Sequence, residues 1–175
     1  MTANRENRAA EARKQGLTSW LRLRFLHKDK EEESPVDSDF LRDLSGLQKV
    51  GRYEIAGKLG QGSMGVVYLG KDPYINRHVG IKISRPAAGL VEEKANKYRE
   101  RFFIEAQSAG RLMHPNIVAI YDAGMYEDFC YITMEYIDGP TLQKFCSKDE
   151  LLPINRVVEI LFTACRALDY AHKKG

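Results

Sequence analysis

A run of three glycines enclosed by strand-like sequence restricts the fold more than any other segment. The run follows the spacing G-x-G-x-x-G and reads Gly60, Gln61, Gly62, Ser63, Met64, Gly65. A dinucleotide-binding fold needs a helix directly after the third glycine, because the pyrophosphate sits at the N-terminus of that helix. Here the next residues are 66–69, Val-Val-Tyr-Leu, which favour a strand. The pattern therefore predicts a strand–turn–strand lid whose bare backbone can lie close over phosphates.

Two other interpretations of these glycines are weaker. Gly65 with Gly70 and Lys71 has the spacing of a P-loop, but the next residue is Asp72, which has no hydroxyl group to bind Mg²⁺. Without further matches, the run would fit an ordinary glycine-rich turn equally well.

A lysine inside an apolar strand provides the further match. Lys82 ends the run 79–82, Val-Gly-Ile-Lys, and a charge at such a position is costly unless it is paired. Glu105 lies further along, in a helix-like segment between apolar neighbours that should turn it inwards. An ion pair between Lys82 and Glu105 would hold the ammonium where it can touch the α- and β-phosphates of ATP. The alternative is two unrelated solvated charges.

Short strands are expected from Tyr53 onwards. Runs of β-branched and aromatic residues predict strands at 53–59, 66–70 and 79–84, with turns at 60–65 and 71–77. Two further strands, 117–121 and 129–136, should form a hairpin around 124–128.

Two helices are predicted from apolar residues that recur at three- and four-residue steps. The first covers 92–113 and ends before His114 and Pro115, because proline disfavours helical geometry in the preceding residue. Its apolar face is Phe102, Ala106, Ala109 and Met113. The apolar face of the second helix is Val157, Leu161, Ala164, Leu168 and Ala171.

The N-terminal tail is segregated by charge. Residues 1–30 hold eight basic and three acidic side chains, whereas 31–45 hold six acidic and one basic. The segment 17–28 is apolar and basic around Trp20, which fits contact with a membrane surface or a partner protein, but a tail that folds back on its acidic part is preferred.

Composition excludes several function classes. A net charge of +3 is too small by itself to argue for binding to nucleic acid or to a membrane, and no nucleic-acid partner is expected. Scattered Cys130, Cys146 and Cys165 fit reduced thiols in the cytosol. No apolar run reaches the roughly 18 residues of a membrane span and no secretory leader is visible, so a cytoplasmic location is expected.

Taken together, these residues resemble the small lobe of protein kinases. The match consists of the glycine loop, Lys82, Glu105, the run 114–118 (His-Pro-Asn-Ile-Val) and the interlobe linker 134–139 (Met-Glu-Tyr-Ile-Asp-Gly). It covers about 50–175, and the runs 51–54 and 115–124 look most like bacterial serine/threonine kinases.

The resemblance implies a role for each matching residue. Leu59, Val67 and the gatekeeper Met134 would line the adenine pocket, while Glu135 and Ile137 would offer a backbone carbonyl and a backbone N–H to the adenine edge. Gly80 replaces the usual alanine and should loosen nucleotide packing by at most about 1 kcal/mol. His114 and His172 would be structural, and His27 and His78 would lie on the surface.

The resemblance also implies that the chain is inactive alone. Residues 168–175 resemble the helix that leads to the H-R-D catalytic loop, and the catalytic Asp and the Asn and D-F-G Asp that bind Mg²⁺ are absent from the sequence. Mg²⁺ is therefore expected only in a complete kinase.

The predicted fold is α+β: a kinase-like small lobe with a five-stranded antiparallel sheet and one principal helix, followed by the first helices of a large lobe. The expected divisions are a tail at 1–49, the small lobe at 50–137, and the linker and first helices at 138–175. The favoured function is the ATP-binding portion of a serine/threonine kinase that phosphorylates proteins. A non-catalytic module that binds nucleotide or a partner stays open, and a different nucleotide-binding enzyme is least favoured.

Overall fold

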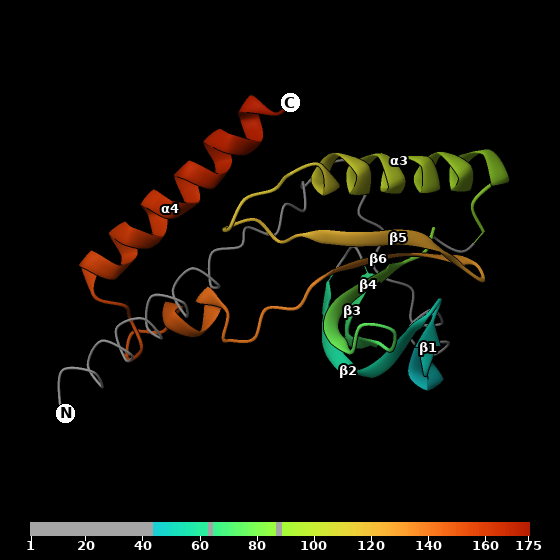
Figure 1. Cartoon of the computed structure of the whole chain (residues 1–175), viewed down its shortest axis with the longest axis horizontal. Coiled ribbons are helices and arrows are strands. Elements are labelled where there is room, and N and C mark those ends of the chain that lie inside the picture. Colours follow the sequence, from blue (N-terminus) through green and yellow to red (C-terminus); the bar gives the residue numbers. More distant parts are fainter. Residues whose placement is uncertain (1–43, 63–64, 87–88) are drawn as a thin grey trace. The chain divides into compact units, whose positions relative to one another are not determined.

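The computed structural model describes residues 44–62, 65–86 and 89–175 (Figure 1). The predictions for the tail at 1–43, which include the 17–28 segment and His27, lie outside the described residues. The same holds for Ser63 and Met64 of the glycine run.

A six-stranded antiparallel sheet forms most of the described structure. Its strands lie in the order β1-β2-β3-β4-β6-β5. Their bounds are β1 (Lys49–Val50), β2 (Tyr53–Gly62), β3 (Gly65–Asp72), β4 (Arg77–Ser84), β5 (Ile120–Tyr126) and β6 (Phe129–Glu135). The antiparallel sheet is confirmed, with one strand more than the predicted five. The short helix η1 (Leu44–Gly46) and the first residue of the additional strand β1 fall within 1–49, where a tail was expected.

One face of the sheet carries the larger core. Leu44 of η1 is only 3% exposed and joins this core, and the Tyr68 hydroxyl donates a hydrogen bond to its carbonyl oxygen. The remaining buried members are Val50, Tyr53, Val66, Tyr68, Val79, Ile81, Ile83, Phe129 and Tyr131. Strand β4 is buried on both faces from Val79 onwards, as expected of a central strand.

Helix α3 (Glu92–Gly110) packs against β5 and β6 (Figure 1). Phe102 and Ala106 of the helix pack with Cys130 and Ile132 of β6 in a second, separate apolar cluster. The partly buried Phe103, Ile120 and Ala123 pack against this cluster. The helix ends at Gly110, three residues before the predicted end, and Met113 is 85% exposed. Glycine is a poor helix former, so the chain leaves the helix at Gly110 before Pro115 takes effect.

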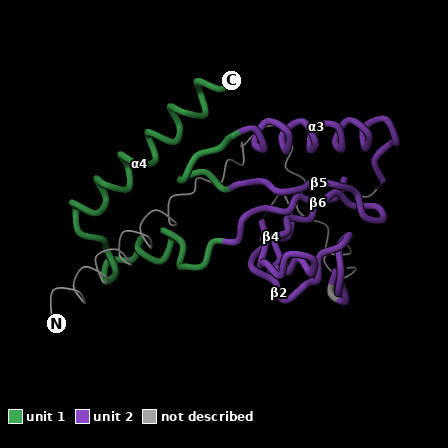
Figure 2. The backbone as a smooth tube through the Cα atoms, in the orientation of Figure 1, with its two compact units in different colours: residues 1–25, 112–118, 137–175 green, residues 26–111, 119–136 purple. Residues whose placement is uncertain are grey.

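Residues 112–118 and 137–175 belong to a second compact unit (Figure 2). It contains η2 (Leu142–Cys146) and α4 (Ile154–Lys173), and its core is Ile117, Ala167 and Ala171, with Leu112 and Tyr170 alongside. The predicted helix is confirmed, but its predicted apolar face is only partly buried: Val157 and Leu161 are 39% and 58% exposed. No helix of the described residues is long and apolar enough to cross a membrane.

Candidate nucleotide-binding site

The glycine run forms the tip of the β2–β3 hairpin. Antiparallel pairing places Gly60 opposite Val67 and Gly62 opposite Gly65. No atom lies within 4 Å of the place where a side chain at Gly60 or Gly62 would begin. The backbone at these two positions is therefore open to a ligand, and Leu59 beside them is 47% exposed.

Gly65 has a different role from the other two glycines. Its φ angle is +124°, and a Cβ atom there would lie 2.1 Å from the carbonyl oxygen of Ile83. Only glycine fits a position with this backbone geometry and this close an approach. Gly65 thus lets the hairpin pack directly onto β4.

Lys82 lies in the middle of the sheet and is only 6% exposed. It pairs with Val67 on β3 and with Ile132 on β6. Because side chains alternate along a strand, Lys82 shares a face of β4 with Gly80 and Ser84. The glycine hairpin and the buried lysine are therefore on neighbouring strands, as the sequence predicted.

Glu105 does not join Lys82 in this structure. Its side chain is exposed, and in the described part of the chain no ion pair connects the two residues. The expectation that its neighbours turn it inwards is wrong, since α3 buries the stripe of Ala95, Phe102 and Ala106. Glu105 is about 100° around the helix axis from Ala106, which places it at the flank of this stripe. Its role beside Lys82 stays a prediction.

Met134 occupies the space that Gly80 leaves free. The two residues face each other across β4 and β6, and a Cβ atom at Gly80 would lie 3.2 Å from Met134 Cγ. The expectation that the nucleotide packs more loosely at Gly80 was based only on the missing methyl group. In the structure, the half-buried Met134 side chain lies against the glycine.

Glu135, near the start of the predicted linker, is held by hydrogen bonds to Ala119. The Glu135 backbone N–H donates to the Ala119 carbonyl at 2.8 Å, and Glu135 Oε2 accepts from the Ala119 N–H at 3.4 Å. The ring of Tyr136 packs edge-on against His78, which is exposed. Ile137 is half-buried and belongs to the second unit, which is described by itself.

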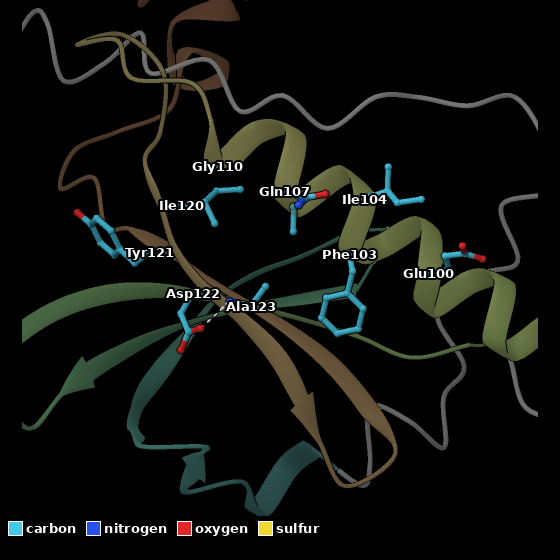
Figure 3. A pocket seen from close by; sticks show the side chains of 10 residues that line it. Glu100, Phe103, Ile104, Gln107, Gly110, Ile120, Tyr121, Asp122 and Ala123 are labelled. Carbon is cyan, nitrogen blue, oxygen red and sulfur yellow. Dashed lines mark hydrogen bonds between the residues drawn. The ribbon is translucent and has the colours of Figure 1, made fainter. Parts of the chain in front are cut away.

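A separate pocket of about 690 Å³ lies between α3 and β5 (Figure 3). None of the residues predicted for the nucleotide site lines it. Its helical wall repeats at three- and four-residue steps, a pattern that the sequence analysis did not consider. The lining residues are Glu100, Phe103, Ile104, Ala106, Gln107, Gly110, Ile120, Tyr121, Asp122 and Ala123.

A charged cluster at the strand ends was also missed. Arg52 Nε lies 3.2 Å from the buried Asp72 carboxylate and its Nη1 lies 3.9 Å from Asp122. The Tyr53 hydroxyl donates to Asp122 at 3.2 Å. Burial opposes ionisation of Asp72, but hydrogen bonds from the Tyr74 N–H and from Arg52 prevail and lower the pKa of Asp72 below its usual value. Because Arg52 in the turn before β2 meets residues of β3 and β5, local sequence patterns do not reveal the cluster.

Other residues with reactive side chains lie outside the glycine hairpin and the Lys82 strand. His114 Nδ1 accepts a hydrogen bond from the Asn116 N–H at 3.1 Å, and its ring packs on Tyr170. Cys130 is buried, and burial raises the pKa of its thiol, while Cys146 and Cys165 are exposed.

Comparison with known proteins adds to this geometry. Residues 53–175 match the family described as the protein kinase domain. The chain is 40% identical over 128 residues to the serine/threonine-protein kinase PknB of Mycobacterium leprae, an alignment that covers 71% of this chain and 20% of PknB. It is 39% identical over 130 residues to the serine/threonine-protein kinase PrkC of Bacillus subtilis, with 74% of this chain and 19% of PrkC covered.

Solved structures that resemble this chain are also kinase domains. The crystal structure of the kinase domain of PknI from Mycobacterium tuberculosis superposes with a TM-score of 0.57 at 32% identity, covering 75% of this chain and 52% of that domain. A double mutant of the same domain gives a TM-score of 0.60 at 33% identity, covering 71% of this chain and 50% of that domain. The chain therefore spans about a fifth of the curated relatives and about half of the solved domains.

Proposed function

Because the chain belongs to the protein kinase domain family, we propose that it is the ATP-binding part of a serine/threonine protein kinase, which as a whole transfers the γ-phosphate of ATP to proteins. One observation carries this proposal. The open glycine backbone at Gly60 and Gly62 lies on β2, buried Lys82 lies on β4, and β3 pairs with both strands. A lysine ammonium on this face of the sheet can bind a phosphate chain through charge-assisted hydrogen bonds.

The residues present fit a nucleotide. In this proposal, the phosphates lie beneath the Gly60–Gly62 backbone, where no side chain blocks a close approach. The Lys82 ammonium neutralises charge on the α- and β-phosphates. The adenine ring lies among Leu59, Val67 and Met134, and the backbone of Glu135 and Ile137 binds its edge.

The proposal for the isolated chain is limited to binding. The 175 residues contain neither an H-R-D nor a D-F-G motif, and in the described ranges no three His, Cys, Asp or Glu side chains cluster as metal ligands. Phosphoryl transfer depends on Mg²⁺ and on a group that accepts the proton of the substrate hydroxyl. The chain alone should therefore bind ATP without turnover.

Glu105 completes the site only after a movement. Its exposed carboxylate has to turn towards β4 before it can pair with Lys82. Such a movement has to change how α3 packs, because Phe102 and Ala106 contact Cys130 and Ile132 of β6. We propose that the Lys82–Glu105 pair forms when the nucleotide binds.

Calorimetric titration of the chain with ATP tests the function. Wild type should bind ATP weakly, with little effect of Mg²⁺, and Lys82→Met should abolish the binding. Lys71→Met is the matched control, because Lys71 lies on β3 opposite His78, away from the glycine tip. Folded wild-type protein that binds no ATP, or equal losses in both variants, would overturn the proposal and favour a non-catalytic interaction module.

A further inference from the structure

The pocket between α3 and β5 lies at an edge of the sheet. Strand β5 is the last of the six strands, and among the described residues it pairs only with β6. The Ala123 N–H of this strand donates to the Asp122 carboxylate at 2.9 Å. An edge strand presents backbone N–H and C=O groups that can bind an added strand. The pocket therefore lies next to a backbone that can hold an extended segment.

The two faces of β5 differ in polarity. Ala123 is opposite Ile132 of β6 and packs in the apolar cluster against α3. Asp122 is opposite Thr133, the next residue along β6, so alternation places it on the face away from the helix. In Figure 3 the Phe103 ring points from α3 towards β5, and Asp122 points away from the helix. An added strand would meet apolar side chains on one face and a carboxylate on the other.

Both faces of this edge are accessible to a partner. Ile104 on the helical wall of the pocket is 54% exposed. The Asp122 side chain is 36% exposed, although Arg52 and Tyr53 lie against it. Glu100 adds a second, exposed carboxylate to the helical wall. Exposed apolar side chains next to carboxylates fit a partner segment that is both apolar and basic.

We propose that this edge binds an extended segment of a partner protein in which apolar residues alternate with basic ones. The apolar side chains enter the pocket on the α3 face, and the basic side chains lie beside Asp122 on the other face. The Ala123 N–H exchanges the Asp122 carboxylate for a backbone carbonyl of the segment, so this carboxylate pairs with a basic side chain. The site goes beyond the proposed function, since no residue predicted for the nucleotide lines the pocket.

Titration of the whole chain with a short peptide, followed by NMR at the backbone amides, tests the inference. The probe is Leu-Arg-Leu-Arg-Phe, a sequence that occurs in the tail at 21–25. Binding should shift the amides of 120–125, and Ile104→Lys should weaken it at least about ten-fold, because an ammonium replaces an apolar side chain in the pocket. Ile75→Lys is the matched control. Ile75 is 59% exposed between β3 and β4, outside the pocket, and its replacement should leave binding unchanged.

Two control peptides separate strand addition from general attraction. Leu-Glu-Leu-Glu-Phe should bind at least about ten-fold more weakly, because its carboxylates would lie beside Asp122. Leu-Leu-Phe-Arg-Arg has the composition of the probe without its alternation and should bind as weakly. Absence of binding, equal binding of all three peptides, or no effect of Ile104→Lys would overturn the inference. Shifts at 120–125 in a Leu23→Lys chain without peptide would also overturn it, because they would show that the chain's own tail occupies the edge.

Discussion

Replacing Gly65 by alanine tests the packing of the glycine hairpin onto β4. The new Cβ atom would lie 2.1 Å from the Ile83 carbonyl oxygen, and 3.1 Å from the Ile83 carbonyl carbon. A positive φ angle costs a non-glycine residue about 1–2 kcal/mol. Displacing a backbone carbonyl in a central strand adds about 1–3 kcal/mol. Gly65→Ala should therefore lower the free energy of unfolding by about 3 kcal/mol, a large share of the stability of a small domain.

Urea denaturation followed by circular dichroism measures this loss. With a slope of about 1–3 kcal/mol per molar urea, the midpoint should fall by at least about 1 M. The matched control is Gly60→Ala, because a Cβ atom at Gly60 has no neighbour within 4 Å. That variant should unfold within about 1 kcal/mol of wild type and yet bind ATP more weakly, since its methyl group stands over the phosphates. Equal midpoints for the two variants would refute the assignment of a structural role to Gly65 and a binding role to Gly60.

Three other perturbations have defined outcomes. Asp72→Asn should destabilise the fold at pH 7, and its difference from wild type should shrink as pH falls below about 4. The reason is that a lowered carboxyl pKa stabilises the fold fully above the usual value and loses this effect as pH falls through the lowered value. A pH-independent difference in acid unfolding curves would contradict this. Gly124→Ala places a Cβ atom 2.8 Å from the Tyr131 hydroxyl, so the Tm of this variant should fall by several degrees. Adding Tyr131→Phe should recover part of that fall, and no recovery would argue against this contact. Gly80→Ala should weaken ATP binding by only a few-fold, because flexible Met134 can shift by a few tenths of an ångström; a complete loss in calorimetry would show that the space is rigid.

Local patterns predicted the sheet and the glycine hairpin well. The β-branched run after Gly65 distinguished a strand from a helix, and the structure places a strand there. The apolar run around Lys82 predicted a buried strand, and Lys82 is buried in it. Both predictions depend on the strand preference of residues close together in sequence, and these residues do form strands in the structure.

Errors occurred where a partner distant in sequence decides the outcome. The strand predicted from Ile117 begins at Ile120, because Ile117 packs with Ala167 and Ala171 in the other unit. The orientation of Glu105 depends on how α3 rolls on the sheet, and neighbours on either side in sequence do not determine this. Helical periodicity likewise cannot tell which apolar residues of α4 meet a partner.

Hydrogen exchange with and without ATP tests the central claim most directly, because it locates the nucleotide on the chain. ATP should slow amide exchange at 58–68 and 79–85, across the glycine hairpin and the Lys82 strand, and Lys82→Met should remove this protection. Exchange in α4 should not change. Protection confined to 100–123, around the pocket between α3 and β5, or its absence from the hairpin in a chain that binds ATP, would contradict the account.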